Sequence, residues 1–148
     1  MASTDFRLRY PLRVRWAEVD KQGVVFNGHY LTYCDIAITE YMRDIGLRYP
    51  EELLALGSDL YVRKATLDYH AGAQYDDELL ICARTASLGR TSLRFLVEIV
   101  RAASPDDVLI EGELIYVNVD PATKKSSPWP LRLRDLILGY ERVAPEQR

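Results

Sequence analysis

The sequence predicts an α+β domain in which a curved antiparallel sheet of five strands wraps one long, mostly buried helix. Three observations support this prediction. Apolar residues alternate along the first segment, they recur at three- and four-residue spacing over residues 30–46, and four strand-like segments then follow one another across short turns. Short turns join antiparallel neighbours, so the four later strands should lie side by side in one sheet.

Residues 6–16 are predicted to form the first strand, because apolar residues at the even positions alternate with Pro11 and arginines at the odd ones. Pro11 lacks a backbone donor, which favours an edge position or a bulge. The arginines of this strand form a basic stripe: Arg7, Arg9, Arg13 and Arg15. A solvated or ion-paired strand face explains this stripe more simply than a nucleic-acid surface does.

The helix predicted over residues 30–46 has an apolar face made of Leu31, Cys34, Ala37, Ile38, Tyr41, Met42 and Ile45. Tyr33 and Ile36 widen this face, so much of the helix should be buried, and Gly46 is a plausible end. A short helix is expected over residues 50–57, and another over about residues 131–140.

The remaining strands are predicted at residues 60–75, 78–88, 92–102 and 109–119, with turns at Asp76-Asp77, Gly89-Arg90 and residues 104–107. In the last strand, Leu109, Ile115, Val117 and Val119 should share the apolar face. No linker or internal repeat divides the chain, so residues 1–148 are expected to form a single domain.

Composition narrows the class of protein. The 148 residues carry a net charge of −3, with a pI near 5.4, which makes bulk nucleic-acid binding a poor fit. No apolar run approaches the roughly 20 residues that a membrane helix needs, and the N-terminus lacks an apolar signal core. We therefore expect a cytoplasmic protein, in which Cys34 and Cys82 are buried thiols.

Several well-known catalytic patterns are absent from the sequence. There is no G-x-S-x-G, no Walker glycine-lysine motif and no G-x-G-x-x-G. His29 and His70 are the only histidines, and neither H-E-x-x-H nor C-x-x-C accompanies them. The sequence thus predicts neither a metal site nor a bound cofactor.

The segment E-V-D-K-Q-G-V-V-F-N-G-H-Y, residues 18–30, holds the best candidate site. Asp20 lies between a strand and a helix, in a loop richer in apolar residues than a solvated turn needs. Asn27 and Gly28 suit the entry to the helix, whose free N–H groups and dipole favour developing negative charge. A carboxylate facing such an oxyanion site is a minimal hydrolytic arrangement. Glu18 is the best alternative carboxylate, whereas Asp35 and Glu40 lie on the helix itself.

The pattern D-x-x-G-V-V-F-N-x-x-Y at residues 20–30, followed by R-D-I-G-L at 43–47, resembles the hotdog-fold acyl-CoA thioesterases, most closely the 4-hydroxybenzoyl-CoA thioesterase type. Residues 73–81, A-Q-Y-D-D-E-L-L-I, resemble a turn and strand of the same family. The Leu88–Ser92 turn falls where that family has a basic turn. The resemblance covers nearly the whole chain.

The resemblance implies that Asp20 is the catalytic carboxylate, acting either as the nucleophile or as a general base on water. It implies that Asn27 offers its backbone N–H to the thioester carbonyl. The substrate-binding residues would then be Gly28, His29, Tyr30, Arg90 and Thr91, with Arg90 reaching the coenzyme A phosphates. His29 could instead be structural, in the helix entry, and the acyl group stays open because Asn27 and His29 depart from the aromatic-substrate members.

The resemblance also implies a homo-oligomer, a dimer or tetramer with sites between subunits. Two other functions remain open on the sequence. One is a hydratase or dehydratase that acts on an acyl thioester, and the other is a non-catalytic module that binds acyl-CoA or an acyl carrier protein.

Overall fold

The computed structural model describes residues 2–148. Its helices are α1 (Ala2–Asp5), α2 (His29–Asp44), α3 (Glu51–Ala55) and α4 (Leu131–Tyr140), with a 3-10 turn η1 (Trp16–Glu18). Its strands are β1 (Leu8–Arg13), β2 (Asp59–Tyr69), β3 (Glu78–Leu88), β4 (Ser92–Arg101), β5 (Ser104–Val119) and β6 (Glu146–Gln147).

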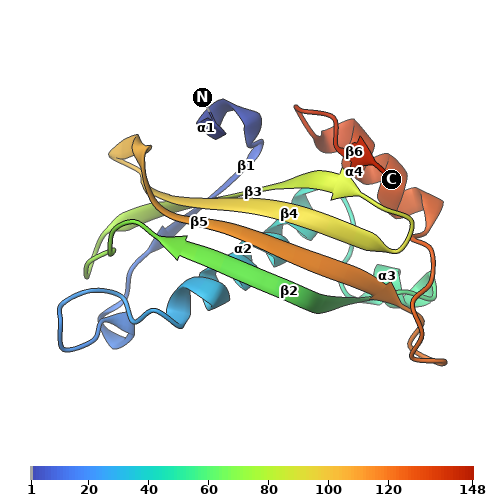
Figure 1. Cartoon of the computed structure of the whole chain (residues 1–148), viewed down its shortest axis with the longest axis horizontal. Coiled ribbons are helices and arrows are strands. Elements are labelled where there is room, and N and C mark those ends of the chain that lie inside the picture. Colours follow the sequence, from blue (N-terminus) through green and yellow to red (C-terminus); the bar gives the residue numbers. More distant parts are fainter. Residues whose placement is uncertain (1) are drawn as a thin grey trace.

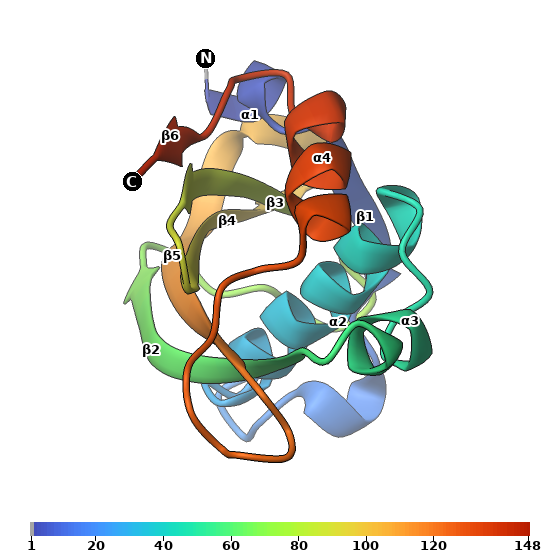
Figure 2. The same ribbon diagram turned by 90° about the vertical axis from the view of Figure 1, so that its right-hand side faces the viewer.

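One sheet has the strand order β1-β3-β4-β5-β2, with antiparallel pairing throughout, and the two-residue β6 adds to β3 in parallel. The sheet curves around α2, and α3 and α4 lie towards one end of it (Figures 1 and 2). The predicted hotdog architecture is confirmed. The order leaves β1 and β2 at the two edges of the five long strands, so Pro11 occupies an edge, as expected.

Helix α2 is buried as its periodicity predicts. Tyr33, Cys34, Ala37 and Tyr41 are fully buried against the inner face of the sheet. The helix ends before Gly46, whose φ of +96° suits a residue without a side chain. Cys34 and Cys82 are both buried, free thiols.

The first strand is shorter than predicted. It ends at Arg13, and Trp16 begins the turn η1 with 72% of its surface exposed, because backbone bonds from Val14 go to the turn before β3 rather than along the strand. The basic stripe is largely engaged within the chain. Arg13 pairs with Asp76 and Glu78, and Arg15 pairs with Glu18.

The strand predicted at 60–75 ends at Tyr69 instead. The N–H groups of His70 and Ala71 both reach the Leu109 carbonyl, which closes the pairing with β5. Residues 70–73 then leave the sheet, and the Ala73 carbonyl accepts a bond from the Val25 N–H. The chain therefore bends toward the Asp20 loop where the sequence suggested a continuing strand.

Two predictions for β5 were wrong. The strand begins at Ser104, and the turn before it is at Ala102 and Ala103. Its buried face carries Ile110, Leu114 and Tyr116, while Ile115, Val117 and Val119 lie half-buried on the other face. Asn118 sits on the buried face because its amide donates to the carbonyls of Ser127 and Pro128.

Within residues 2–148, none of the helices has the length and apolar content required to span a membrane.

Candidate active site

Asp20 begins a tight turn between η1 and α2. Its N–H bonds to the Val24 carbonyl (2.9 Å), its own carbonyl accepts from Gly23 (3.0 Å), and Gly23 has a φ of +83°. The carboxylate oxygen Oδ1 accepts the Gln22 N–H at 2.8 Å. Across the described residues, no donor contacts the second oxygen, Oδ2. One carboxylate oxygen thus fixes the turn, and the other has no hydrogen-bond partner within residues 2–148.

The loop, the start of α2 and the segment after β2 enclose a cavity of about 400 Å³. It is lined by Asp20, Gln22, Val24, Val25, Asn27, Tyr30, Tyr69, His70, Ala71 and Gly72. Three of the predicted site residues, Asp20, Asn27 and Tyr30, therefore come together in one pocket. The walls combine a carboxylate with apolar and aromatic side chains, as small-molecule sites do.

The two residues before α2 carry backbone donors that are free within the described chain, and one of them, Asn27, lines this pocket. The His29 N–H is used on the Phe26 carbonyl at 2.9 Å, but in the described part of the chain the N–H groups of Asn27 and Gly28 have no acceptor. A Cβ on Gly28 would approach the Phe26 ring to 3.0 Å, so the close turn favours glycine. The dipole of the 16-residue helix adds positive potential at the same place.

Tyr30 forms a fixed wall of the pocket. It is 2% exposed, and its hydroxyl accepts the Ala73 N–H at 3.0 Å, which ties the helix to the segment after β2. Burial raises the pKa of Tyr30, and the nearby Tyr69 and Asp20 raise it further, against the Ala73 hydrogen bond and Arg101, which lower it. The hydroxyl stays protonated, so Tyr30 acts here as a neutral wall.

The pocket residues at the end of β2 and just after it were not predicted from the sequence. The Tyr69 hydroxyl donates to the Asn27 carbonyl at 3.2 Å, and its ring meets the Tyr30 ring edge-on. His70 Nε2 lies 3.5 Å from Glu111 Oε2. The small residues Ala71 and Gly72 were a signal that the strand stops here; a Cβ on Gly72 would lie 2.9 Å from the Val24 side chain, so glycine allows the Asp20 loop to approach closely.

Glu18 was the alternative carboxylate predicted from the sequence, but its side chain does not point into the Asp20 pocket. Its carboxylate is buried, accepts the Tyr33 hydroxyl at 2.9 Å and the Arg15 N–H at 2.8 Å, and pairs with the Arg15 guanidinium at 2.6 Å. Burial acts to raise the pKa of Glu18, but these hydrogen bonds outweigh it, so that pKa is lowered. Glu18 does not line the pocket, because the turn η1 directs its side chain toward α2.

Arg90, Thr91, Gly28 and His29 do not line the pocket either. His29 packs edge-on against Phe26, with ring centres 5.7 Å apart. Arg90 and Thr91 occupy the β3–β4 turn at the opposite end of the sheet from the Asp20 loop (Figure 1). Strand β4 gives the distance between the two ends. Ser92 adjoins the β3–β4 turn, and Ile99 lies level with Tyr69, because both pair with Ile110 of β5. The strand from Ser92 to Ile99 spans about 23 Å.

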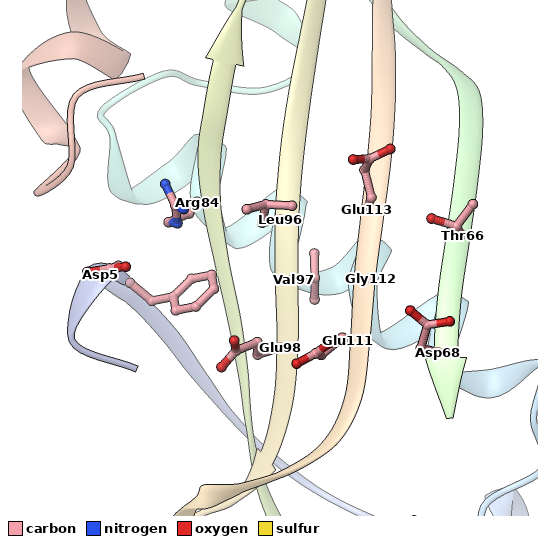
Figure 3. A pocket seen from close by; sticks show the side chains of 11 residues that line it. Asp5, Thr66, Asp68, Arg84, Leu96, Val97, Glu98, Glu111, Gly112 and Glu113 are labelled. Atoms are coloured by element: carbon pink, nitrogen blue, oxygen red, sulfur yellow. The ribbon is translucent and has the colours of Figure 1, made fainter. Parts of the chain in front are cut away.

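A second hollow of about 420 Å³ lies on the outer face of the sheet. Figure 3 shows its carboxylates, among them Glu98 and Glu111, which lie together on neighbouring strands. Burial and the charge of Glu111 raise the pKa of Glu98. This acidic face would repel a polyanion such as coenzyme A, and it lacks a helix start, so the Asp20 pocket is the better candidate. Among residues 2–148 there is no cluster of three or more His, Cys, Asp or Glu arranged to hold a metal ion.

Comparison with protein families matches residues 22–106 to the thioesterase superfamily. An acyl-CoA thioester hydrolase, YbgC, from Escherichia coli is 35% identical over 122 residues, covering 82% of this chain and 89% of that protein. A putative esterase from Synechocystis is 30% identical over 114 residues, covering 77% of this chain and 68% of its own length.

Solved structures share the fold at lower identity. A 1,4-dihydroxy-2-naphthoyl-CoA thioesterase from Synechocystis superposes with a TM-score of 0.80 at 23% identity, covering 88% of this chain and 94% of that one. The PA5185 protein from Pseudomonas aeruginosa gives a TM-score of 0.82 at 21% identity, covering 95% and 96%.

Proposed function

Since the chain belongs to the thioesterase superfamily and is a thioester hydrolase, we propose that it cleaves acyl-CoA to a free acid and coenzyme A in the Asp20 pocket. One observation carries this assignment. A carboxylate with one free oxygen shares a single pocket with a helix start whose Asn27 and Gly28 N–H groups have no acceptor within residues 2–148.

The proposed chemistry has two possible routes. In the first, Asp20 Oδ2 attacks the thioester carbonyl, the C–S bond breaks, coenzyme A leaves as the thiolate, and water hydrolyses the mixed anhydride. In the second, Asp20 takes a proton from a water molecule whose oxygen attacks the carbonyl; the tetrahedral intermediate then collapses with cleavage of the C–S bond, and the coenzyme A thiolate leaves with the proton that Asp20 returns. In both routes the negative charge on the carbonyl oxygen is stabilised by the N–H groups of Asn27 and Gly28 and by the α2 dipole.

The proposal includes an oligomer, at least a dimer. Strand β2 is an edge with 11 residues, and Tyr61, Val62 and Tyr69 are exposed along it. A long, exposed and apolar edge favours pairing with another chain. Antiparallel pairing of β2 with its copy across a two-fold axis would bring the partner's Gly89–Arg90 turn to the end of the joined sheet that carries Asp20.

This arrangement reconciles the distance between Arg90 and Asp20 with a role for Arg90 in coenzyme A binding. Arg90 would serve the Asp20 pocket of the partner subunit, where its guanidinium can reach a phosphate. A monomer by light scattering at assay concentration would remove both the dimer and this role for Arg90.

The expected cytoplasmic location is supported by the two buried, unpaired cysteines, Cys34 and Cys82. Thioesters on an acyl carrier protein remain an alternative substrate, because the carrier presents the same thioester carbonyl to the pocket.

The decisive experiment is thiol release from a panel of acyl-CoA thioesters of different acyl size and polarity, with the wild-type protein and Asp20→Asn. Thiol release by the wild type alone supports the proposal. Acyl-CoA binding without turnover would favour a binding module, and loss of the double bond of an enoyl-CoA without thiol release would favour a hydratase.

A further inference from the structure

The Tyr69 hydroxyl donates to the Asn27 carbonyl, and the role inferred for this hydrogen bond depends on the thioester hydrolysis proposed above. We propose that Tyr69 is a positioning residue, which orients and polarises the peptide between Asn27 and Gly28 so that the Gly28 N–H serves as a donor to the carbonyl oxygen of the transition state.

The Tyr69 ring packs against Tyr30 on one side. Tyr69 is the last residue of β2, and its ring meets that of Tyr30 edge-on, with centres 5.7 Å apart and planes at 69°. Tyr30 is itself fixed, since it is 2% exposed and accepts the Ala73 N–H. This ring contact places the Tyr69 hydroxyl 3.2 Å from the Asn27 carbonyl oxygen.

The Tyr69 hydroxyl contacts the peptide that carries one of the free donors. The Asn27 carbonyl and the Gly28 N–H belong to the same peptide unit, which is trans, so the two groups point in opposite directions. Anchoring the carbonyl on Tyr69 therefore sets the direction of the Gly28 N–H. A hydrogen bond accepted by a carbonyl also polarises its peptide, which makes the attached N–H a better donor.

The backbone N–H groups that precede α2 differ in how they are used. In the described part of the chain, the His29 N–H is used on the Phe26 carbonyl, whereas the N–H groups of Asn27 and Gly28 have no acceptor. Glycine at position 28 has no side chain to hold its peptide in place, and a residue elsewhere must do so. Tyr69, from an element about 40 residues later in the chain, supplies that contact.

An oxyanion donor acts in the transition state more than in substrate binding, so its misalignment should lower kcat and leave KM nearly unchanged. Tyr69→Phe keeps the ring and removes the hydroxyl. Loss of one neutral hydrogen bond corresponds to a fall of roughly 3- to 10-fold in kcat. The KM for the best acyl-CoA of the panel should stay within about twofold, as expected for loss of a contact that matters only in the transition state.

Tyr75→Phe is the matched control. Tyr75 is exposed to the same extent as Tyr69, 53%, its ring meets that of Trp16 edge-on, and its hydroxyl has no partner within residues 2–148. Thermal unfolding and light scattering of both variants should match the wild type, which a structural or interface role for the Tyr69 hydroxyl would not allow.

The proposal is overturned if kcat of Tyr69→Phe equals that of Tyr75→Phe, or if KM rises while kcat is kept. It is also overturned if the Tyr69 variant alone changes oligomeric state or unfolding temperature enough to account for the loss. Absence of thiol release by the wild type is a different result, which would refute the proposed function itself and this inference with it.

Discussion

At the end of the sheet that carries the Gly89–Arg90 turn, the C-terminal segment donates hydrogen bonds to the backbone carbonyls of that turn. The Trp129 N–H bonds to the Arg90 carbonyl at 3.0 Å, and the Arg134 guanidinium donates to the Gly89 carbonyl at 2.8 Å. At the end that carries Asp20, by contrast, one carboxylate oxygen and two helix-entry N–H groups have no partner among residues 2–148.

The end that carries the Gly89–Arg90 turn, called here the closed end in contrast to the open end at Asp20, also contains a buried polar network. The Tyr41 hydroxyl and the Thr85 N–H both donate to Glu141 Oε2, at 2.5 and 2.7 Å, and Tyr41 contacts the Thr85 hydroxyl at 2.8 Å. These bonds join α2 and β3 to the residue that follows α4. The other oxygen of this carboxylate, Glu141 Oε1, is buried without a hydrogen-bond partner within residues 2–148, so the network is satisfied only in part.

This difference in hydrogen bonding suggests that the two ends of the sheet have different roles, one in stability and the other in catalysis. At the closed end, the turn carbonyls and the Tyr41 hydroxyl bind the C-terminal segment, whereas at the open end Asp20 and Asn27 line a pocket. Perturbing the Asp20 pocket should therefore change catalysis, and perturbing the buried network around Glu141 should change stability.

The sharpest test of this division is Asp20→Asn at the open end. The amide keeps the size and the Oδ1 acceptor for Gln22 but loses the charge needed for attack or proton abstraction. We expect kcat for thioester hydrolysis to fall by about 100- to 10,000-fold, the loss typical of a general base, with little change in Tm. Steady-state thiol release and thermal unfolding measure the two quantities.

Glu18→Gln is the matched control, because it removes a charge two residues away that faces α2 instead of the pocket. The ion pair with Arg15 is lost, so Tm should fall, while kcat should stay within about tenfold of wild type, far above the loss of a general base. If Asp20→Asn retained more than about a tenth of wild-type kcat, well short of a general-base loss, Asp20 would not be the reactive carboxylate.

At the closed end, Glu141→Ala should show the opposite behaviour. It removes the acceptor of Tyr41 and leaves the Thr85 N–H unpaired, at a cost of roughly 1–3 kcal/mol for such a group. In a chain of this size that corresponds to a fall of about 2–12 °C in Tm. The kcat of the folded enzyme should be unchanged, and a loss of kcat as large as that of Asp20→Asn would refute the division between the two ends.

The pH dependence of stability sharpens the same prediction. Burial raises the pKa of Glu141 from 4.5, although its bonds to Tyr41 and Thr85 act to lower it. A carboxyl whose folded pKa is raised contributes stability that is present below its unfolded pKa and is lost as the pH rises through its folded pKa. The difference in Tm, wild type minus Glu141→Gln, should therefore become smaller as the pH rises above about 4.5. A Tm difference that does not change with pH would contradict this prediction.

The smallest expected effect belongs to Arg90→Ala, on the surface of the closed end. If Arg90 reaches the coenzyme A of the partner's site, KM should rise about 3- to 10-fold with a smaller change in kcat, as for loss of uniform binding. Arg43→Ala is the control, since Arg43 is an exposed arginine of α2 paired with Glu40. An unchanged KM would leave Arg90 an ordinary turn residue.

Features set by local interactions were predictable from the sequence. The helix period of residues 30–46, its end at Gly46 and the turn at Gly89-Arg90 each depend on neighbours a few residues away, and the structure has them nearly as predicted. The position of Asp20 between a strand and a helix start was predicted in the same way. The sequence thus determined the architecture and the residues at the helix entry of the candidate site.

The buried face of β5 could not be predicted, because Leu114–Val117 is apolar on both faces and the polar Asn118 is satisfied by a segment nine and ten residues later. Three further features were equally inaccessible. The contact of Tyr69 with Asn27, the turning of Glu18 toward Tyr33 and the distance of Arg90 from Asp20 all join residues far apart in the chain. Such contacts depend on the register and curvature of the whole sheet, which only the tertiary structure decides.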